Sequence, residues 1–219
     1  MSETAASPPA AFAPSELVVL FGDRFAPEAG MLAGKEEVLT SGAKVHAQRL
    51  MEAALAAALL AVHRSGAARL EEQTGKALFG LLKRQKLVLL RGAGPSPFPP
   101  HSLEAALVAT AGEETEAWDA LAKWIEVESN DPAGRALGQV KAGLAERGLL
   151  EVRERKALKV FTVSSYALPD ATRAAAEREP LEPVRDLLAA AEQREPTLWK
   201  AVRSAVDSAR AHMTERSDD

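Results

Sequence analysis

The feature that most constrains the fold is a thirteen-residue apolar run, Leu50–Val62, interrupted only by Glu52. Alanine and leucine would lie around most of the circumference of such a helix, so we predict a helix surrounded by other elements. The helical pattern extends from Glu36 to Arg64 and ends at Ser65-Gly66, where glycine favours a left-handed cap. Because a membrane-spanning helix needs about 20 apolar residues, this run predicts a core helix and no membrane span.

A β-hairpin pattern follows this central helix. Short apolar runs at Ala68–Glu71 and Lys76–Phe79 flank Gln73-Thr74-Gly75, which has the composition of a turn. A further strand is predicted at Lys86–Arg91, and the Gly/Pro/Ser segment from Gly92 to Pro100 predicts a loop.

The same order of helix and hairpin recurs later in the chain. Asp131-Pro132 predicts the start of a helix, since proline is favoured in a first turn, and this helix ends at Gly148. Strands at Leu149–Val152 and Leu158–Val163 then flank a charged turn, Arg153–Lys156. A helix followed by a hairpin is also how winged-helix DNA-binding domains are arranged.

The remaining pattern is helical. Ser102 is expected to cap a helix from Leu103 to about Ala111, and a second helix from Glu116 to Val127 carries Trp118 and Trp124 on one face, as core anchors. The last 50 residues are predicted to be helical, while Leu17–Phe21 suits either a short helix or a strand. The predicted fold is a mainly α-helical, compact single domain around a central apolar helix, with peripheral β-hairpins. Its expected limits are a disordered tail at 1–14, the domain at 15–212 and a disordered C-terminus at 213–219.

Signals for catalysis are weak. The chain has no cysteine, which excludes disulfides, thiolate nucleophiles and zinc–thiolate sites. The four histidines, His46, His63, His101 and His212, lack metal-ligand spacing, and no nucleophile-elbow motif is present. His63, at the end of the apolar helix, is expected to have a packing or capping role. We therefore expect a cytoplasmic protein that is not an enzyme, with no cofactor and no metal.

Positive charge is concentrated in the two hairpin regions, although the formal net charge is −4. Residues 64–91 carry seven basic and two acidic residues, and residues 135–160 carry seven basic and three acidic residues. If the hairpins lie together, they form one basic face that attracts phosphate of lipid head groups or of nucleic acid; alternatively, the charges only solubilise exposed hairpins. The candidate anion-binding residues are Arg64, Arg69, Lys83, Arg84, Lys86, Arg135, Lys141, Arg153, Arg155 and Lys156.

The order of several motifs over residues 15–170 resembles the Golgi phosphoprotein 3 family, which has many bacterial members. The shared features are an apolar helix that ends at a glycine before a strand, a basic leucine-rich strand, a Leu-x-x-Ala-Leu helix, a Trp-Ile-Glu segment, a Leu-x-x-Arg-Gly-x-Leu phrase and a closing hairpin. They fall at Leu59–Glu71, Lys86–Arg91, Leu103–Leu107, Trp124–Glu126, Leu144–Leu150 and the segment between Phe161 and Pro169.

This resemblance implies a mainly helical adaptor. Eukaryotic members of the family bind phosphatidylinositol 4-phosphate and capture the cytoplasmic tails of glycosyltransferases. The positions of the family's phosphate-binding arginines fall on Leu55, Leu137 and Gln139 in this chain, with Arg135 and Lys141 close by. We therefore expect peripheral association with an anionic membrane surface, or with protein tails, without the bidentate arginine clamp.

Two other functions are compatible with the sequence. A winged-helix DNA-binding protein would use the Arg135–Arg147 helix as its reader and the Arg153–Lys159 hairpin as its wing, although the helix offers few side chains that read bases and nucleic acid is disfavoured as a partner. A protein–protein scaffold would use the long C-terminal helices. Self-association is left open.

Overall fold

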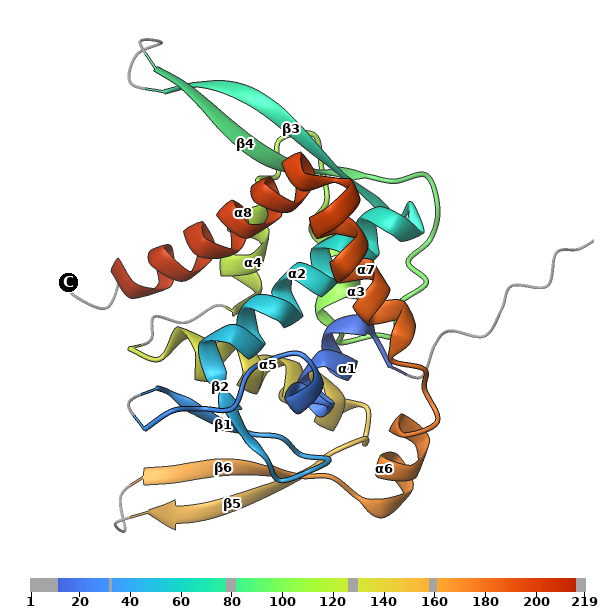
Figure 1. Ribbon diagram of the computed structural model, residues 1–219, viewed down its shortest axis with the longest axis vertical. Coiled ribbons are helices and arrows are strands. Elements are labelled where there is room, and N and C mark those ends of the chain that lie inside the picture. The colour runs from blue at the N-terminus through green and yellow to red at the C-terminus, as the bar shows by residue number, and fades with distance from the viewer. Residues whose placement is uncertain (1–11, 32, 78–81, 126–129, 158–160, 216–219) are drawn as a thin grey trace, which may run out of the picture.

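The structure is a computed structural model, and it describes residues 12–31, 33–77, 82–125, 130–157 and 161–215. It confirms the predicted fold class: a mainly helical, compact fold with peripheral antiparallel hairpins (Figure 1). The helices are α1 (Pro14–Leu20), the 3-10 helix η1 (Gly22–Arg24), α2 (Ala47–Ser65), α3 (Leu103–Thr110), α4 (Ala117–Ile125), α5 (Pro132–Glu146), α6 (Asp170–Ala176), α7 (Glu182–Arg194) and α8 (Pro196–Glu215). The strands are β1 (Lys35–Glu37), β2 (Lys44–His46), β3 (Ala68–Ala77), β4 (Leu82–Arg91), β5 (Glu151–Ala157) and β6 (Phe161–Ala167).

Helix α2 is the central helix that the apolar run predicts. Every residue from Ala54 to Val62 is buried, and α2 packs against α1, α3, α5, α7 and α8. The helix ends as expected at Gly66, whose φ of 73° lies in the left-handed region that glycine favours. Helix α2 is nonpolar around most of its circumference because other helices pack against its different sides.

The predicted start of this helix at Glu36 is wrong. Residues 35–46 form the short hairpin β1–β2, in which Glu36 pairs with Val45. The turn contains Gly42 with a φ of 73°, a backbone conformation that favours glycine over the residues of a continuous helix. Val38 and Val45 are buried, as β-branched residues of a hairpin packed on a core often are.

The two larger hairpins exist, but both turns are further along the chain than predicted. Strand β3 runs through the expected turn at Gln73–Gly75, and Ala77 pairs with Leu82. In the second hairpin the expected turn at Arg153–Lys156 is part of β5, and Ala157 pairs with Phe161. The ladders extend through these polar residues because cross-strand pairing continues beyond the apolar segments on which the prediction relied.

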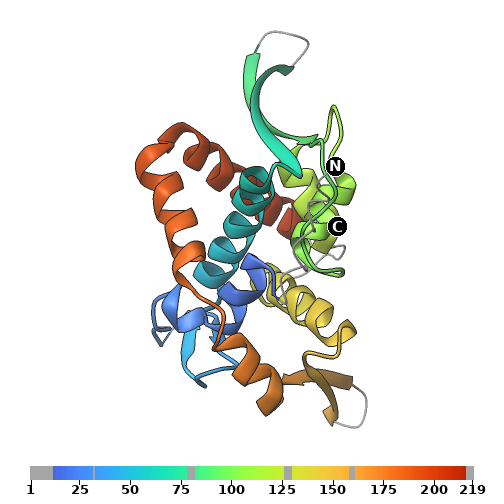
Figure 2. The same cartoon turned by 90° about the vertical axis from the view of Figure 1, so that its right-hand side faces the viewer.

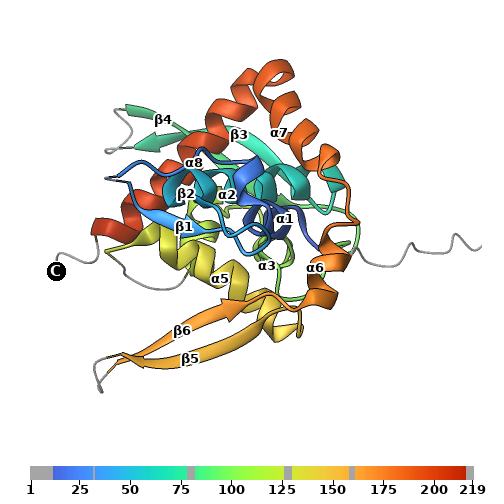
Figure 3. The same cartoon turned by 60° about the horizontal axis from the view of Figure 1, so that its bottom comes forward.

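The two hairpins lie at opposite ends of the molecule. In Figure 1, β3–β4 projects from the top and β5–β6 closes the bottom, and Figures 2 and 3 show the same separation from other directions. The expectation that they combine into one basic face is therefore wrong. Helices α4 and α8 support β4, whose residue Leu89 also exchanges backbone hydrogen bonds with Gly112 and Thr115.

Most predicted helix starts are confirmed by their caps. The Ser102 hydroxyl accepts a hydrogen bond from the Ala105 amide at 3.1 Å, and the Asp131 carboxylate accepts one from the Gly134 amide at 2.9 Å. Trp118 and Trp124 pack half-buried against the core, as expected for anchors.

The limits of the folded region differ slightly from the expected ones. Phe12 and Ala13 are buried and Pro14 begins α1, although the sequence assigned all three residues to the tail. Met213 is also buried, within α8. Residues 1–11 and 216–219, where disorder is predicted, lie outside the described residues.

Candidate functional site

The ten predicted anion-binding residues divide into two groups of five. Arg64, Arg69, Lys83, Arg84 and Lys86 lie at the end of α2 or on β3–β4, whereas Arg135, Lys141, Arg153, Arg155 and Lys156 lie on α5 or β5. The side chains of Lys83, Arg84, Arg155 and Lys156 are outside the described part of the structure, although the strand positions of these residues are described.

Two of these cations are paired with carboxylates of the same chain. Arg64 forms an ion pair with Glu195 at the end of α7, and Lys141 forms one with Glu36 on β1. The Lys141 and Glu36 side chains are only 12% and 16% exposed. Lys141 therefore joins α5 to the first hairpin and is poorly placed to bind an external anion. In contrast, Arg69 and Arg135 are exposed, and Arg153 is exposed beside Glu151.

The outer half of the β3–β4 hairpin, residues 73–86, contains four basic residues and no acidic residue. In the antiparallel register Lys76 faces Lys83, Gly75 faces Arg84 and Gln73 faces Lys86. Like charges at facing positions destabilise an antiparallel pair. Of these three pairs, Lys76–Lys83 places like charges at facing positions, and this half of the hairpin carries an excess of positive charge.

A groove of about 640 Å³ lies between this hairpin and α8, and we call it the hairpin groove. Its basic side chains are Lys86 and Lys200, and Gln85, Thr197, Ser204 and Ser208 add hydrogen-bond donors. The indole of Trp118 closes one side and donates from Nε1 to Glu116 at 2.5 Å. Glu72 and Glu116 also line the groove, so its lining combines equal numbers of acidic and basic residues with hydroxyls, which suits a polar ligand.

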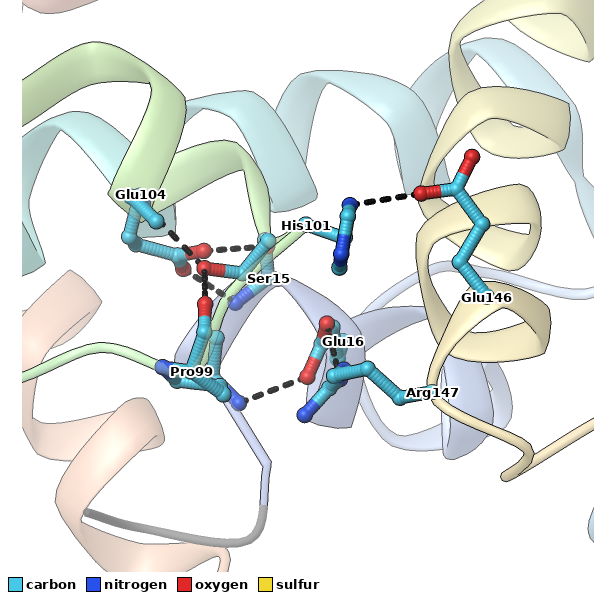
Figure 4. Close-up of polar contacts among 10 residues, drawn as sticks. Ser15, Glu16, Pro99, His101, Glu104, Glu146 and Arg147 are labelled. Atoms are coloured by element: carbon cyan, nitrogen blue, oxygen red, sulfur yellow. Dashed lines mark hydrogen bonds and ion pairs between the residues drawn. The ribbon is translucent and has the colours of Figure 1, made fainter. Parts of the chain in front are cut away.

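A second polar cluster is buried where α1, α3 and α5 meet (Figure 4). The Glu104 carboxyl on α3 is fully buried and accepts hydrogen bonds from the Ser15 amide at 2.7 Å and the Ser15 hydroxyl at 2.8 Å. Burial raises the pKa of Glu104 to about 7, against the lowering effect of these hydrogen bonds. The carboxyl thus ties α3 to the first turn of α1.

The neighbouring Glu16 joins α1 to α5. Its carboxylate accepts a hydrogen bond from the Ala13 amide at 2.8 Å, as in a capping box, and forms an ion pair with Arg147. Burial raises the pKa of Glu16 although the Ala13 amide and Arg147 act in the opposite direction. No local sequence signal could identify this cluster, because the partners are 89 and 131 residues apart.

The loop before α3 also touches α5 at this point. His101 has a φ of 62°, a conformation that side chains other than glycine seldom adopt, and its Nδ1 lies 2.6 Å from the Glu146 carboxylate. Gly143 permits the approach, since a Cβ there would lie 2.2 Å from the His101 carbonyl oxygen. These contacts hold elements together, so we assign the cluster to the stability of the fold.

His63 fills the packing role expected from its position. Its Nδ1 accepts a hydrogen bond from the Leu70 amide at 3.2 Å, and burial lowers its pKa. Among the described residues no group of three or more His, Asp or Glu side chains could hold a metal ion. None of the helices in the described ranges is long and apolar enough to cross a membrane.

Comparison with protein-family models, curated proteins and solved structures finds no match for this chain. The resemblance to the Golgi phosphoprotein 3 family therefore stays a prediction from the motif order. What the geometry defines is a mainly helical protein with a projecting basic hairpin and a polar groove at its base.

Proposed function

We propose that this protein acts by binding, not catalysis, and that it associates peripherally with anionic membranes through the outer half of β3–β4 and the hairpin groove. The observation that supports this most directly is the register that places Lys76 opposite Lys83 and Arg84 one position nearer the base, with no acid between Gln73 and Lys86. The hairpin projects from the helical body, so a flat surface has access to it (Figure 1).

Membrane binding of this kind depends on several basic residues, each of which contributes a small part of the binding free energy. Each Lys or Arg near an anionic membrane contributes about 1 kcal/mol, so the four basic residues of the outer half contribute about 4 kcal/mol together. This attraction decreases at high ionic strength because exposed charges are screened. Lys200 in the hairpin groove offers an additional contact to a phosphate group beside the hairpin.

A selective phosphoinositide pocket is not part of the proposal. Leu55 and Leu137, at two of the positions where the related family carries arginine, are both 1% exposed and belong to the core. Neither position could present a cation to a head group even after substitution without burying a charge. Membrane binding is therefore expected to increase with the total negative charge of the lipids, whichever head group carries it.

The test is co-sedimentation with vesicles of neutral phosphatidylcholine, with and without phosphatidylserine, across a series of salt concentrations. The double variant Arg84→Gln/Lys86→Gln should bind anionic vesicles about 30-fold more weakly, which corresponds to about 2 kcal/mol for two charges. The matched control, Arg135→Gln/Arg153→Gln, removes two charges from α5 and the β5–β6 hairpin at the other end and should bind like the wild type. Equal losses in both variants, or no binding to anionic vesicles at low salt, would refute the proposed surface.

Phosphoinositide vesicles matched for total charge complete the experiment. Preference for phosphoinositide at equal charge would mean that a dedicated head-group site exists elsewhere on the molecule. The DNA-binding alternative is less well supported, since the Lys141 side chain on the predicted reader helix is in an ion pair with Glu36. Duplex binding at 50 mM salt that Arg135→Gln/Arg153→Gln abolishes would favour that alternative.

A further inference from the structure

A cavity of about 320 Å³ lies on another part of the molecule, where α7 and α8 pack on α2. Its apolar wall consists of Phe25, Ala53, Ala56, Leu188, Trp199 and Val206. The volume is at the small end of the range of about 300–1,000 Å³ that is typical of small-molecule sites. The apolar wall is large enough for a short chain or a single ring.

The cavity exists because α2 has small side chains, Ala53 and Ala56, where it faces α8. Arg49, Glu52, Ala53 and Ala56 form one stripe along α2, at spacings of three and four residues. The two alanines do not reach across to α8, where Trp199 stands on the opposite wall. The bulky residues at the ends therefore enclose a space that the alanines leave open.

Charged side chains surround this apolar space. Arg49 Nη1 lies 2.8 Å from the Glu52 carboxylate, and Arg210 lies 3.9 Å from Glu52 and 3.6 Å from Asp207. Arg203, one turn beyond Trp199 on α8, lines the same cavity and has no ion pair or hydrogen bond within the described ranges. Two arginines and two carboxylates thus line the cavity, and both carboxylates already have a cationic partner.

From this arrangement we infer that the cavity is a binding site for a small amphipathic anion: a carboxylate with a short apolar chain. The apolar part lies against Trp199 and between Ala53 and Ala56, and the carboxylate pairs with the guanidinium of Arg203. A neutral chain lacks the charge-assisted hydrogen bond that this pairing supplies. A cationic chain would place its charge beside Arg49 and Arg203, while Glu52 and Asp207 already have partners.

This site is separate from the surface proposed for membrane binding. The hairpin groove is lined by Lys200 but not by Arg203, and the cavity is lined by Arg203 but not by Lys200. Lys200 and Arg203 on α8 are therefore matched positions for substitution, one in each site. Either proposal can fail while the other stands.

The test uses octanoate, octanol and octylammonium as probes of equal chain length, with affinity measured by calorimetric titration of the full chain. Octanoate should bind about fivefold more tightly than octanol, since the ion pair is made by an exposed arginine, and octylammonium should not bind. Octanoate should also change the tryptophan emission of the wild type but not that of Trp199→Phe, which retains Trp118 and Trp124.

Two variants locate the site. Arg203→Gln should weaken octanoate binding about fivefold, since an ion pair at an exposed arginine contributes up to about 1 kcal/mol, while Lys200→Gln should bind octanoate like the wild type. Ala53→Leu fills the cavity and should abolish octanoate binding. Circular dichroism and the melting temperature of this variant check that it is folded. Equal affinity for octanoate and octanol, equal losses in Arg203→Gln and Lys200→Gln, or no octanoate binding by the folded wild type would each overturn the inference.

Discussion

The buried Glu104 carboxyl makes the stability of this protein depend on pH in a direction that the structure determines. The folded protein retains the Glu104 proton up to about pH 7, whereas the unfolded chain releases it near the ordinary pKa of 4.5. The folded state thus binds more protons across this interval. The free energy of unfolding should be highest below about pH 4.5, decrease as the pH rises toward 7, and level off above that.

The size of this effect follows from the same two values. Stability changes by about 1.4 kcal/mol for each pH unit between the two pKa values, so the interval from 4.5 to about 7 corresponds to about 3 kcal/mol. Because the carboxyl is fully buried, solvent screening reduces this figure little. The raised pKa of Glu16 contributes with the same sign, so the wild-type curve alone does not isolate Glu104.

Substitution of Glu104 by glutamine isolates it. The side-chain amide of Glu104→Gln can accept from the Ser15 amide and donate to the Ser15 hydroxyl, so both contacts are kept without a titrating group. The variant should equal the wild type in stability near pH 4.5 and exceed it by about 3 kcal/mol at pH 8. Urea unfolding followed by tryptophan fluorescence from pH 4.5 to 8.5 measures this difference.

An exposed carboxylate provides the control. Glu113 is exposed ahead of α4, and Glu113→Gln should follow the wild type at every pH. A constant difference between Glu104→Gln and the wild type across the range would refute the reasoning, because it would mean that Glu104 does not change its charge on unfolding in that interval.

Two further substitutions probe the junction of α1, α3 and α5. Arg147→Met leaves the Glu16 carboxylate buried beside an apolar chain and should lower the free energy of unfolding by about 3–5 kcal/mol. The double variant Glu16→Gln/Arg147→Met should recover most of this loss. A loss below about 1 kcal/mol for Arg147→Met in urea unfolding would contradict this prediction. Gly143→Ala should cost about 1–3 kcal/mol because its Cβ would collide with the His101 carbonyl. Gly138→Ala on the same helix meets open space and should stabilise by about 0.5–1 kcal/mol, so equal melting temperatures for these two variants would show that the close approach is not limiting.

Local signals in the sequence were sufficient for the central helix and for most helix ends. Gly66, Ser102 and Asp131 each act within a few residues of their own position, through a left-handed cap or a side chain that accepts a backbone amide. The start of α2 was predicted too early, at Glu36, although Gly42 with its positive φ forms the turn of the β1–β2 hairpin. The hairpin turns were misplaced because Gln73–Gly75 and Arg153–Lys156 resemble turns in composition, although cross-strand pairing keeps them extended.

The site depended on contacts that no local signal carries. Counting charges identified two basic blocks, but the count could not show that β3–β4 and β5–β6 lie at opposite ends, or that Lys141 and Arg64 have partners 105 and 131 residues away. Each intramolecular ion pair neutralises a cation without changing the composition of its block. The charge available to an external anion is therefore decided by tertiary pairing. The outer half of β3–β4 is the strongest candidate, because Lys76 and Lys83 occupy facing positions there and the nearest acids in the hairpin, Glu71 and Glu72, lie toward its base.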